Sequence, residues 1–339
     1  MTKWIRKQYA ESFVFDKEEQ QRLRYRPVVK ASVQIRSRMD ASHPDTIKFV
    51  EGKDFVVNDE EGWIRRTKES RIPDWSQHVL YGKKDFDHTL FGDYSNRDFT
   101  VYADYEYEQD EDADETGGGG DLEYDALASV KEKLQKGQVV TFVVYGDSIS
   151  AGGEASEERY TYYRRFSDHL ADLYPNGNIR VVNCAIGGET SEGGAGRVEH
   201  DVVPHLPDLV TIAYGMNDQN KFNNGNAISL YDYMTNIRFM IETIRRRGDV
   251  SIILVTPCQP NPLWTYTSGQ IGEYAEALRQ LGREYGIGVA DVYAVWQREL
   301  DEGKTPESLL LNNINHPNDY GHYLYYKAFE PILLGKRRS

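Results

Sequence analysis

The C-terminal two thirds of the chain alternates short apolar runs with longer stretches in which apolar residues recur every three or four positions. The short runs are rich in β-branched residues and predict buried strands, whereas the longer stretches predict amphipathic helices. The strands are expected in VVTFVVYG, NIRVVNCAI, PDLVTIAYG, VSIILVTP and IGVADVY. The helices are expected at 122–136, 158–174 and 193–203, and in ISLYDYMTNIRFMIETIRRRG and GEYAEALRQLGREYG. Five such strands joined by crossover helices predict an α/β fold with a doubly wound, five-stranded parallel sheet.

Residues 25–110 have a different pattern, in which apolar and polar residues alternate in short segments between Pro, Gly, Asp and Asn. This pattern predicts a β-sandwich, with a jelly roll as one arrangement. Residues 108–121, EQDEDADETGGGGD, are acidic and then glycine-rich, a composition that cannot bury a core. The sequence therefore predicts a β-sandwich domain at 1–109, a linker at 110–121 and an α/β domain at 122–339.

Charge and composition argue against nucleic acid and membranes as binding partners of this protein. The formal net charge of −14 disfavours nucleic acid, which needs a basic surface. No apolar run approaches the roughly 20 residues of a membrane-spanning helix, so no membrane partner is expected. MTKWIRKQYAESF lacks the apolar core of a signal peptide, and the expected location is cytoplasmic. Cys184 and Cys258 are expected as reduced thiols, and a homo-oligomer is compatible with this composition.

Four polar blocks fall where a parallel sheet places its ligand site, beyond the carboxyl ends of its strands. Gly146-Asp147-Ser148 ends the first predicted strand, NCAIGGETS ends the second, and YGMND ends the third; NNINHPNDYGH precedes the last helix. Together these blocks closely resemble the SGNH (GDSL-type) hydrolase family of esterases and lipases. The resemblance covers about residues 138–335 and implies a flavodoxin-like, three-layer fold.

The resemblance also implies roles for individual residues. Ser148 matches the nucleophile, His316 the general base, and Gly188 and Asn217 the oxyanion-hole residues. A serine hydroxyl needs an imidazole to take its proton, and the tetrahedral intermediate needs preorganised N–H donors. Taken singly, each residue also has a structural explanation, such as a helix cap for Ser148. The four blocks together favour a serine esterase that forms an acyl-enzyme.

The third member of the expected triad departs from the family pattern. Family members usually have an aspartate three residues before the histidine, where this chain has Asn313. Three readings follow: the side-chain oxygen of Asn313 orients His316, a main-chain carbonyl does so in a Ser-His dyad, or the site is weakened. Asp319 is the nearest carboxylate. The alternative function is a non-catalytic or weakened carbohydrate-binding homologue.

The substrate is indicated by one loop. PCQPNPLWTYTSG follows the fourth predicted strand, and its Trp264 and Tyr266 are candidates to stack on a sugar ring or to pack the loop itself. Aromatic and amide side chains suit a small-molecule or carbohydrate ester, with an O-acetylated sugar as the first expectation. No metal-ligand spacing, Walker loop or dinucleotide motif occurs in the sequence, so neither a metal nor a cofactor is expected.

Overall fold

The computed structural model describes residues 3–110, 125–222 and 225–335, and these form two compact units. The N-terminal unit contains the described residues up to Asp110 together with Gln297–Gly321. The C-terminal unit contains the remaining described residues, from Asp125 to Trp296 and from His322 onward.

The boundaries differ from the predicted ones in one respect. The segment 297–321, which the sequence pattern assigned to the α/β domain, packs with the N-terminal unit. The predicted linker at 110–121 lies outside the described residues except for Asp110, which is the last residue of a strand. The chain changes units within two helices, Val292–Asp301 (α6) and Asp319–Lys327 (α8).

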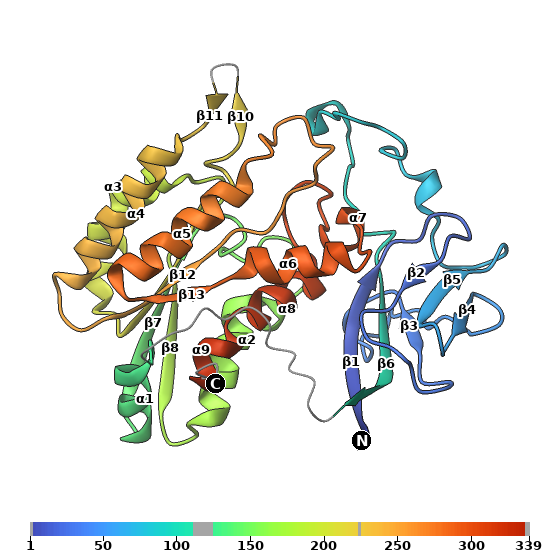
Figure 1. The fold of residues 1–339 in the computed structure, drawn as a ribbon, viewed down its shortest axis with the longest axis horizontal. Coiled ribbons are helices and arrows are strands. Elements are labelled where there is room, and N and C mark those ends of the chain that lie inside the picture. Colours follow the sequence, from blue (N-terminus) through green and yellow to red (C-terminus); the bar gives the residue numbers. More distant parts are fainter. Residues whose placement is uncertain (1–2, 111–124, 223–224, 336–339) are drawn as a thin grey trace. The chain divides into compact units, whose positions relative to one another are not determined.

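The C-terminal unit is built on a parallel sheet with the strand order β13-β12-β9-β7-β8. Its strands are β7 (Val139–Gly146), β8 (Asn178–Asn183), β9 (Leu209–Ala213), β12 (Ser251–Val255) and β13 (Gly288–Ala290). Figure 1 labels four of these strands: β7, β8, β12 and β13. All residues of β9 and β12 are buried, as expected for strands that are covered on both faces. This confirms the predicted five-stranded parallel sheet.

Helices cover both faces of this sheet. They are α1 (Ala128–Gln135), α2 (Tyr162–Leu173), α3 (Ser191–Asp201), α4 (Leu230–Arg245), α5 (Ile271–Tyr285) and α9 (Glu330–Leu334). Short 3-10 turns lie at Glu158–Tyr160 and Val203–His205, and β10 (Lys221–Phe222) pairs with β11 (Gly225–Asn226). Alternate residues of β7 point to opposite layers: Val143 and Tyr145 join the core under α3, α4 and α5, whereas Phe142 packs edge-on against Phe166 of α2. The unit therefore has the predicted three layers.

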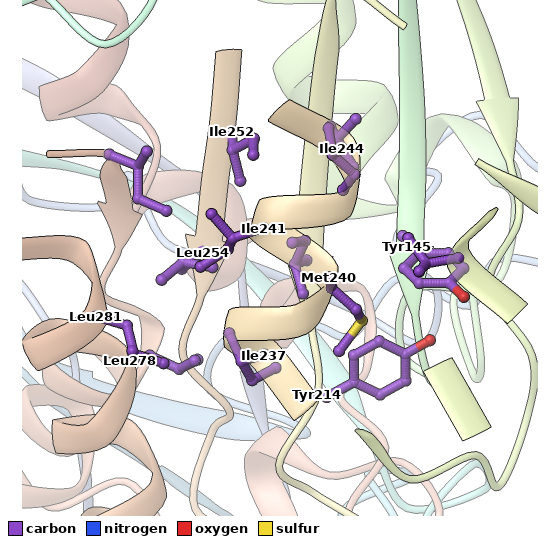
Figure 2. Close-up of a cluster of buried hydrophobic side chains, with 14 of the residues drawn as sticks. Tyr145, Tyr214, Ile237, Met240, Ile241, Ile244, Ile252, Leu254, Leu278 and Leu281 are labelled. Atoms are coloured by element: carbon purple, nitrogen blue, oxygen red, sulfur yellow. The ribbon is translucent and has the colours of Figure 1, made fainter. Parts of the chain in front are cut away.

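Helix α4 illustrates why the sequence folds in this way. Its apolar residues recur at helical spacing and form one buried stripe: Tyr233, Ile237, Met240, Ile241 and Ile244. Figure 2 shows Ile237 and Ile241 beside side chains of α5 and β12, and Met240 beside Tyr214. Fully burying one such side chain contributes about 1.5–3 kcal/mol. This packing holds the sheet whose strand ends carry the candidate site.

The N-terminal unit contains two three-stranded antiparallel sheets, β1-β6-β3 and β2-β5-β4 (Figure 1). The strands are β1 (Lys3–Phe13), β2 (Gln21–Arg22), β3 (Gln34–Arg36), β4 (Phe55–Asn58), β5 (Trp63–Arg66) and β6 (Val101–Asp110). Short 3-10 turns lie at Trp75–Gln77 and His88–Leu90, and the segment from the C-terminal part of the chain adds α7 (Pro306–Leu309). Residues of both sheets share one hydrophobic core, which includes Phe13, Ile35, Phe55, Ile64 and Tyr105. The predicted β-rich N-terminal domain is confirmed.

Candidate active site

The serine turn follows the end of β7 directly. A Cβ on Gly146 would lie 2.5 Å from the main-chain oxygen of Ala213 and 2.6 Å from Ser150 Oγ, so only glycine fits there. The turn then closes on itself, because Ala151 N donates to Asp147 O (2.9 Å). Ser148, half-buried, lies in this closed turn at the carboxyl end of the sheet's central region.

The second block lies beside the serine turn. A Cβ built on Gly187 would be 3.9 Å from Ser148 Cβ, which places the loop after β8 in van der Waals range of the serine. Gly188 has a φ of 75°, in the left-handed region that favours glycine, and it is exposed with open space where a side chain would stand. A substrate can therefore approach the backbone at Gly188 closely.

The third block is tied to the second by side-chain hydrogen bonds. Asn217, just beyond β9, donates from Nδ2 to Glu189 O (2.9 Å). The next residue, Asp218, accepts from Ser191 N (2.9 Å) and Gly215 N (3.0 Å). An amide nitrogen carries two hydrogens, so Asn217 keeps a second donor beside the one that holds Glu189. The structure thus brings together three of the predicted residues, Ser148, Gly188 and Asn217, at the ends of adjacent strands.

The loop that carries Gly188 is braced by an ion pair that the sequence analysis missed. Arg197 of α3 makes a bidentate contact with Glu189, through Nε (2.7 Å) and Nη2 (2.5 Å). Tyr214, the residue after β9, donates to the same carboxylate (2.8 Å), and Arg197 also donates to Cys184 O (2.7 Å). Bidentate arginine–carboxylate pairs fix geometry as well as contributing energy. These residues therefore hold the second block in place.

His316 lies on a turn of the N-terminal unit. The side-chain oxygen of Asn312 accepts hydrogen bonds from the backbone N–H groups of Ile314 (3.0 Å), Asn315 (2.9 Å) and His316 (2.8 Å). Leu311 N donates to His316 O (2.9 Å) and closes the base of the turn. Asn312, which the sequence analysis passed over, therefore shapes the backbone that carries the predicted base.

Asn313 lies in the same turn with an unusual backbone conformation. Its φ is 58°, a left-handed value that asparagine tolerates better than most residues. Its side chain is buried, and Oδ1 accepts from Asn96 Nδ2 at 3.3 Å. Asp319, the alternative carboxylate, is also buried and is the first residue of α8.

The loop after β12 carries the predicted substrate-binding aromatics. Trp264 and Tyr266 pack on each other, with ring centroids 5.7 Å apart. Trp264 is only 6% exposed, whereas Tyr266 is half-buried, so the tyrosine is the more accessible of the two. The loop is tied to the residues after Asn217, because Gln219 Oε1 accepts from Thr267 Oγ1 (3.1 Å) and from Ser268 N (3.0 Å). Gln219, fully buried, is a second anchor that the sequence analysis missed.

Asp147, next to the serine, is fully buried beside other acids. Burial raises the pKa of the Asp147 carboxyl to about 7, and the carboxylates of Asp218 and Glu189 act in the same direction. Backbone hydrogen bonds from Ile149 and Ser150 oppose this rise in pKa. Asp147 is thus a structural acid whose protonated form is favoured by folding.

We expect Asp147→Asn to alter the pH dependence of stability. The stabilising effect of the protonated acid is complete below its ordinary pKa of 3.8 and is lost as the pH rises through about 7. Asparagine keeps an oxygen for the Ile149 N–H without the charge. The melting temperature of the variant should therefore exceed that of the wild type by a margin that grows between about pH 4 and pH 8. At 1.36 kcal/mol per pKa unit, the margin in unfolding free energy grows by about 4 kcal/mol over this pH range.

The control for this measurement is Asp249→Asn, at an exposed position two residues before β12. Its melting temperature should follow the wild-type pH dependence. A margin for Asp147→Asn that does not change with pH would contradict the assignment of a raised pKa to Asp147.

Two further classes of site are not found in the described part of the chain. No group of three or more His, Cys, Asp or Glu side chains within residues 3–110, 125–222 and 225–335 could hold a metal ion. Within the same ranges, no helix has the length and apolar character needed to cross a membrane.

Two curated relatives of this chain are esterases. An acetylxylan esterase of Geobacillus stearothermophilus is 27% identical over 217 residues, which is 58% of this chain and 94% of that protein. An arylesterase of Vibrio mimicus is 29% identical over 136 residues, 40% of this chain and 60% of its own. A solved two-domain esterase active on acetylated mannans has the same fold, with a TM-score of 0.53 and 18% identity over 66% of this chain and 55% of that one.

The family profile gives the broader result. The profile of the GDSL-like Lipase/Acylhydrolase family matches residues 144–324, more than half of the chain. The match begins just before the serine turn and extends past the turn that carries His316, so it includes all four polar blocks. The protein is therefore an ester hydrolase and belongs to the GDSL-like lipase/acylhydrolase family.

Proposed function

We propose that this protein removes short acyl groups, acetyl foremost, from O-acylated carbohydrates by a Ser-His acyl-enzyme mechanism. One observation carries the proposal: the loop of Gly187 and Gly188 lies against Ser148, and the Asn217 amide is hydrogen-bonded to the same loop at Glu189. A nucleophile beside two donor groups is the arrangement that acyl transfer requires.

In the proposed mechanism, Ser148 Oγ attacks the acyl carbonyl carbon while the His316 imidazole takes the hydroxyl proton. The negative charge on the carbonyl oxygen is stabilised by the backbone N–H groups of Ser148 and Gly188 and by the second N–H of Asn217. The C–O bond to the sugar then breaks, and imidazolium gives its proton to the leaving oxygen. Water, deprotonated by His316, then attacks the acyl carbon, and imidazolium returns the proton to Ser148 Oγ as the acyl–Oγ bond breaks and the acid is released.

We assign Asn313 as the positioning residue for His316. It lies three residues before the histidine, in the same turn, and it is buried. Its Oδ1 already accepts from Asn96, which fixes the orientation of the amide. An asparagine in this place serves in the Cys-His-Asn arrangement of papain-like proteases, so loss of the carboxylate is compatible with turnover.

Two observations support a carbohydrate as the alcohol part of the substrate: the similarity to an acetylxylan esterase and the loop that carries Tyr266. The acetylxylan esterase relative is similar over nearly all of its own length. In this chain, half-buried Tyr266 lies on the loop that Gln219 ties to the Asn217 region. An accessible tyrosine on such a loop suits stacking against a sugar ring.

The test compares substrates. We expect acetate release from acetylated xylo- or manno-oligosaccharides, and hydrolysis of p-nitrophenyl acetate at least about 100-fold faster than of p-nitrophenyl octanoate, measured as kcat/KM. Tyr266→Ala should raise KM for the oligosaccharide by about 10-fold, equivalent to about 1.4 kcal/mol, and leave p-nitrophenyl acetate nearly unchanged.

The matched control is Tyr231→Ala, an exposed tyrosine on α4, which should behave as the wild type on both substrates. A preference for octanoate over acetate would contradict the short-acyl proposal. Acetate release from the activated ester but from no acetylated sugar would contradict the carbohydrate part alone.

A further inference from the structure

The segment 297–321, which carries His316 and Asn313, is anchored inside the N-terminal unit by buried charges. Lys304, nearly fully buried, places Nζ 2.7 Å from Glu11 Oε1 and donates to Ser12 O at 2.7 Å. Arg24 donates from Nε to Glu299 at 2.8 Å, so a buried acid of the segment is paired with a base of the N-terminal β-rich residues. Removing one partner of such a buried pair is strongly destabilising, because it leaves an uncompensated buried charge.

Strand β1 reaches the segment closer to the histidine. Ser12 Oγ donates to Ser308 O (2.5 Å), and Val14 N donates to Ser308 Oγ (3.1 Å). The same Ser308 carbonyl accepts from Asn318 Nδ2 (2.7 Å), two residues after His316. Hydrogen bonds thus connect Ser12 of β1, through Ser308, to Asn318, which follows His316 in the chain.

Asn96 makes the most direct connection. It is 0% exposed and donates from Nδ2 to Glu307 O (2.9 Å), Leu310 O (2.9 Å) and Asn313 Oδ1 (3.3 Å). Its backbone N–H donates to Leu311 O (2.6 Å), and Leu311 in turn donates to the carbonyl of His316. The Asn96 side chain therefore bonds at several points to the residues that precede His316, from Glu307 to Asn313.

We propose that Asn96 is a positioning residue for ester hydrolysis. Asn96 fixes the turn from which His316 acts, so its contribution appears in kcat. The inference rests on the proposed function, because it takes His316 as the general base. Misplacing a catalytic group by about 1 Å costs on the order of 100-fold in rate.

The role of Asn96 as a hydrogen-bond donor determines which substitutions test the proposal. Asn96 Nδ2 faces three acceptor oxygens, those of Glu307, Leu310 and Asn313. Asn96→Asp keeps the size of the side chain but places a carboxylate oxygen against these acceptors. Asn96→Ala removes the donor without adding charge. Asn58→Ala is the control, since the Asn58 side chain accepts from Glu61 N within its own turn of the same unit.

The experiment measures kcat and KM of the full chain on p-nitrophenyl acetate. We expect Asn96→Asp and Asn96→Ala to lower kcat by about 10- to 100-fold with KM within about threefold, and Asn58→Ala to match the wild type. In a His316→Ala background, Asn96→Ala should lower the residual rate by less than about twofold, because a residue that acts through His316 has no further effect once the imidazole is gone. Thermal melts identify the variants that fold.

A second variant covers the case in which changes at Asn96 prevent folding. Ser95 Oγ donates to Leu311 O at 3.1 Å, and Ser95→Ala should lower kcat by about three- to tenfold. A folded Asn96→Asp with wild-type kcat, or an Asn96→Ala loss that is equally large in the His316→Ala background, would overturn the inference. Full activity of His316→Ala alone would instead contradict the proposed function, so the two failures are distinguishable.

Discussion

Ser148→Ala should lower kcat for p-nitrophenyl acetate by at least about 10⁴-fold while the protein stays folded. The reason is that the proposed mechanism has no acyl acceptor without the hydroxyl. His316→Ala should cost a similar factor, and the double variant should be little worse than either single one, since nucleophile and base act as a unit. The measurement is kcat for the three variants, with circular dichroism to verify the fold.

The control for the serine is Ser129→Ala. Ser129 lies on α1 and contacts Ser251 Oγ at 3.3 Å, at the amino end of β12 and so at the opposite edge of the sheet from the site. It should keep wild-type kcat. Equal rates for wild type and Ser148→Ala would remove Ser148 from the mechanism and favour the alternative of a chain that binds carbohydrate without turning it over.

The sheet and its strand-end loops were predictable because local signals define them. Buried parallel strands appear as continuous apolar runs, and the fully buried β9 and β12 are such runs. Once the strand order is that of a doubly wound sheet, the residues after neighbouring strands must meet at one edge. Ser148, Gly188 and Asn217 therefore followed from the pattern and the family resemblance together.

The anchoring of the histidine segment was not predictable in this way. Lys304 pairs with Glu11, and Ser308 with Ser12, across nearly three hundred residues, and no local pattern indicates such a pairing. The composition change at 108–121 suggested one boundary, so residues 297–321 were assigned by chain order to the α/β domain. The buried contacts, which decide the actual grouping, depend on tertiary structure alone.

The residues that support the proposed oxyanion-hole loops were also not predictable from the sequence. Glu189 and Arg197 are eight residues apart, a spacing that puts no two side chains together on a single helix or strand, yet α3 brings them into a bidentate pair. Gln219 is polar and has no sequence signature, but its burial makes it the acceptor that fixes the aromatic loop. The supporting roles of Glu189, Arg197 and Gln219 can be recognised only when the hydrogen-bond partners and the burial of their side chains are known.

Asn217→Ala should lower kcat for p-nitrophenyl acetate by about 10²–10³-fold and change KM by less than about threefold. The amide acts on charge that develops only in the transition state, so ground-state binding is affected little. We expect the larger end of this range, because Asn217 Nδ2 has two tasks: one N–H holds Glu189 O at 2.9 Å, and the other is proposed to face the oxyanion. The variant loses the donor and also relaxes the loop that presents Gly188.

Asn178→Ala serves as the matched control, since Asn178 is exposed at the amino end of β8, away from the strand ends that carry the site. It should keep both kinetic constants. A loss in Asn217→Ala that appears in KM with kcat unchanged would show that the amide binds substrate rather than the transition state. Unchanged kcat and KM would leave Asn217 with its bond to Glu189 as its whole role, a structural link between the second and third loops.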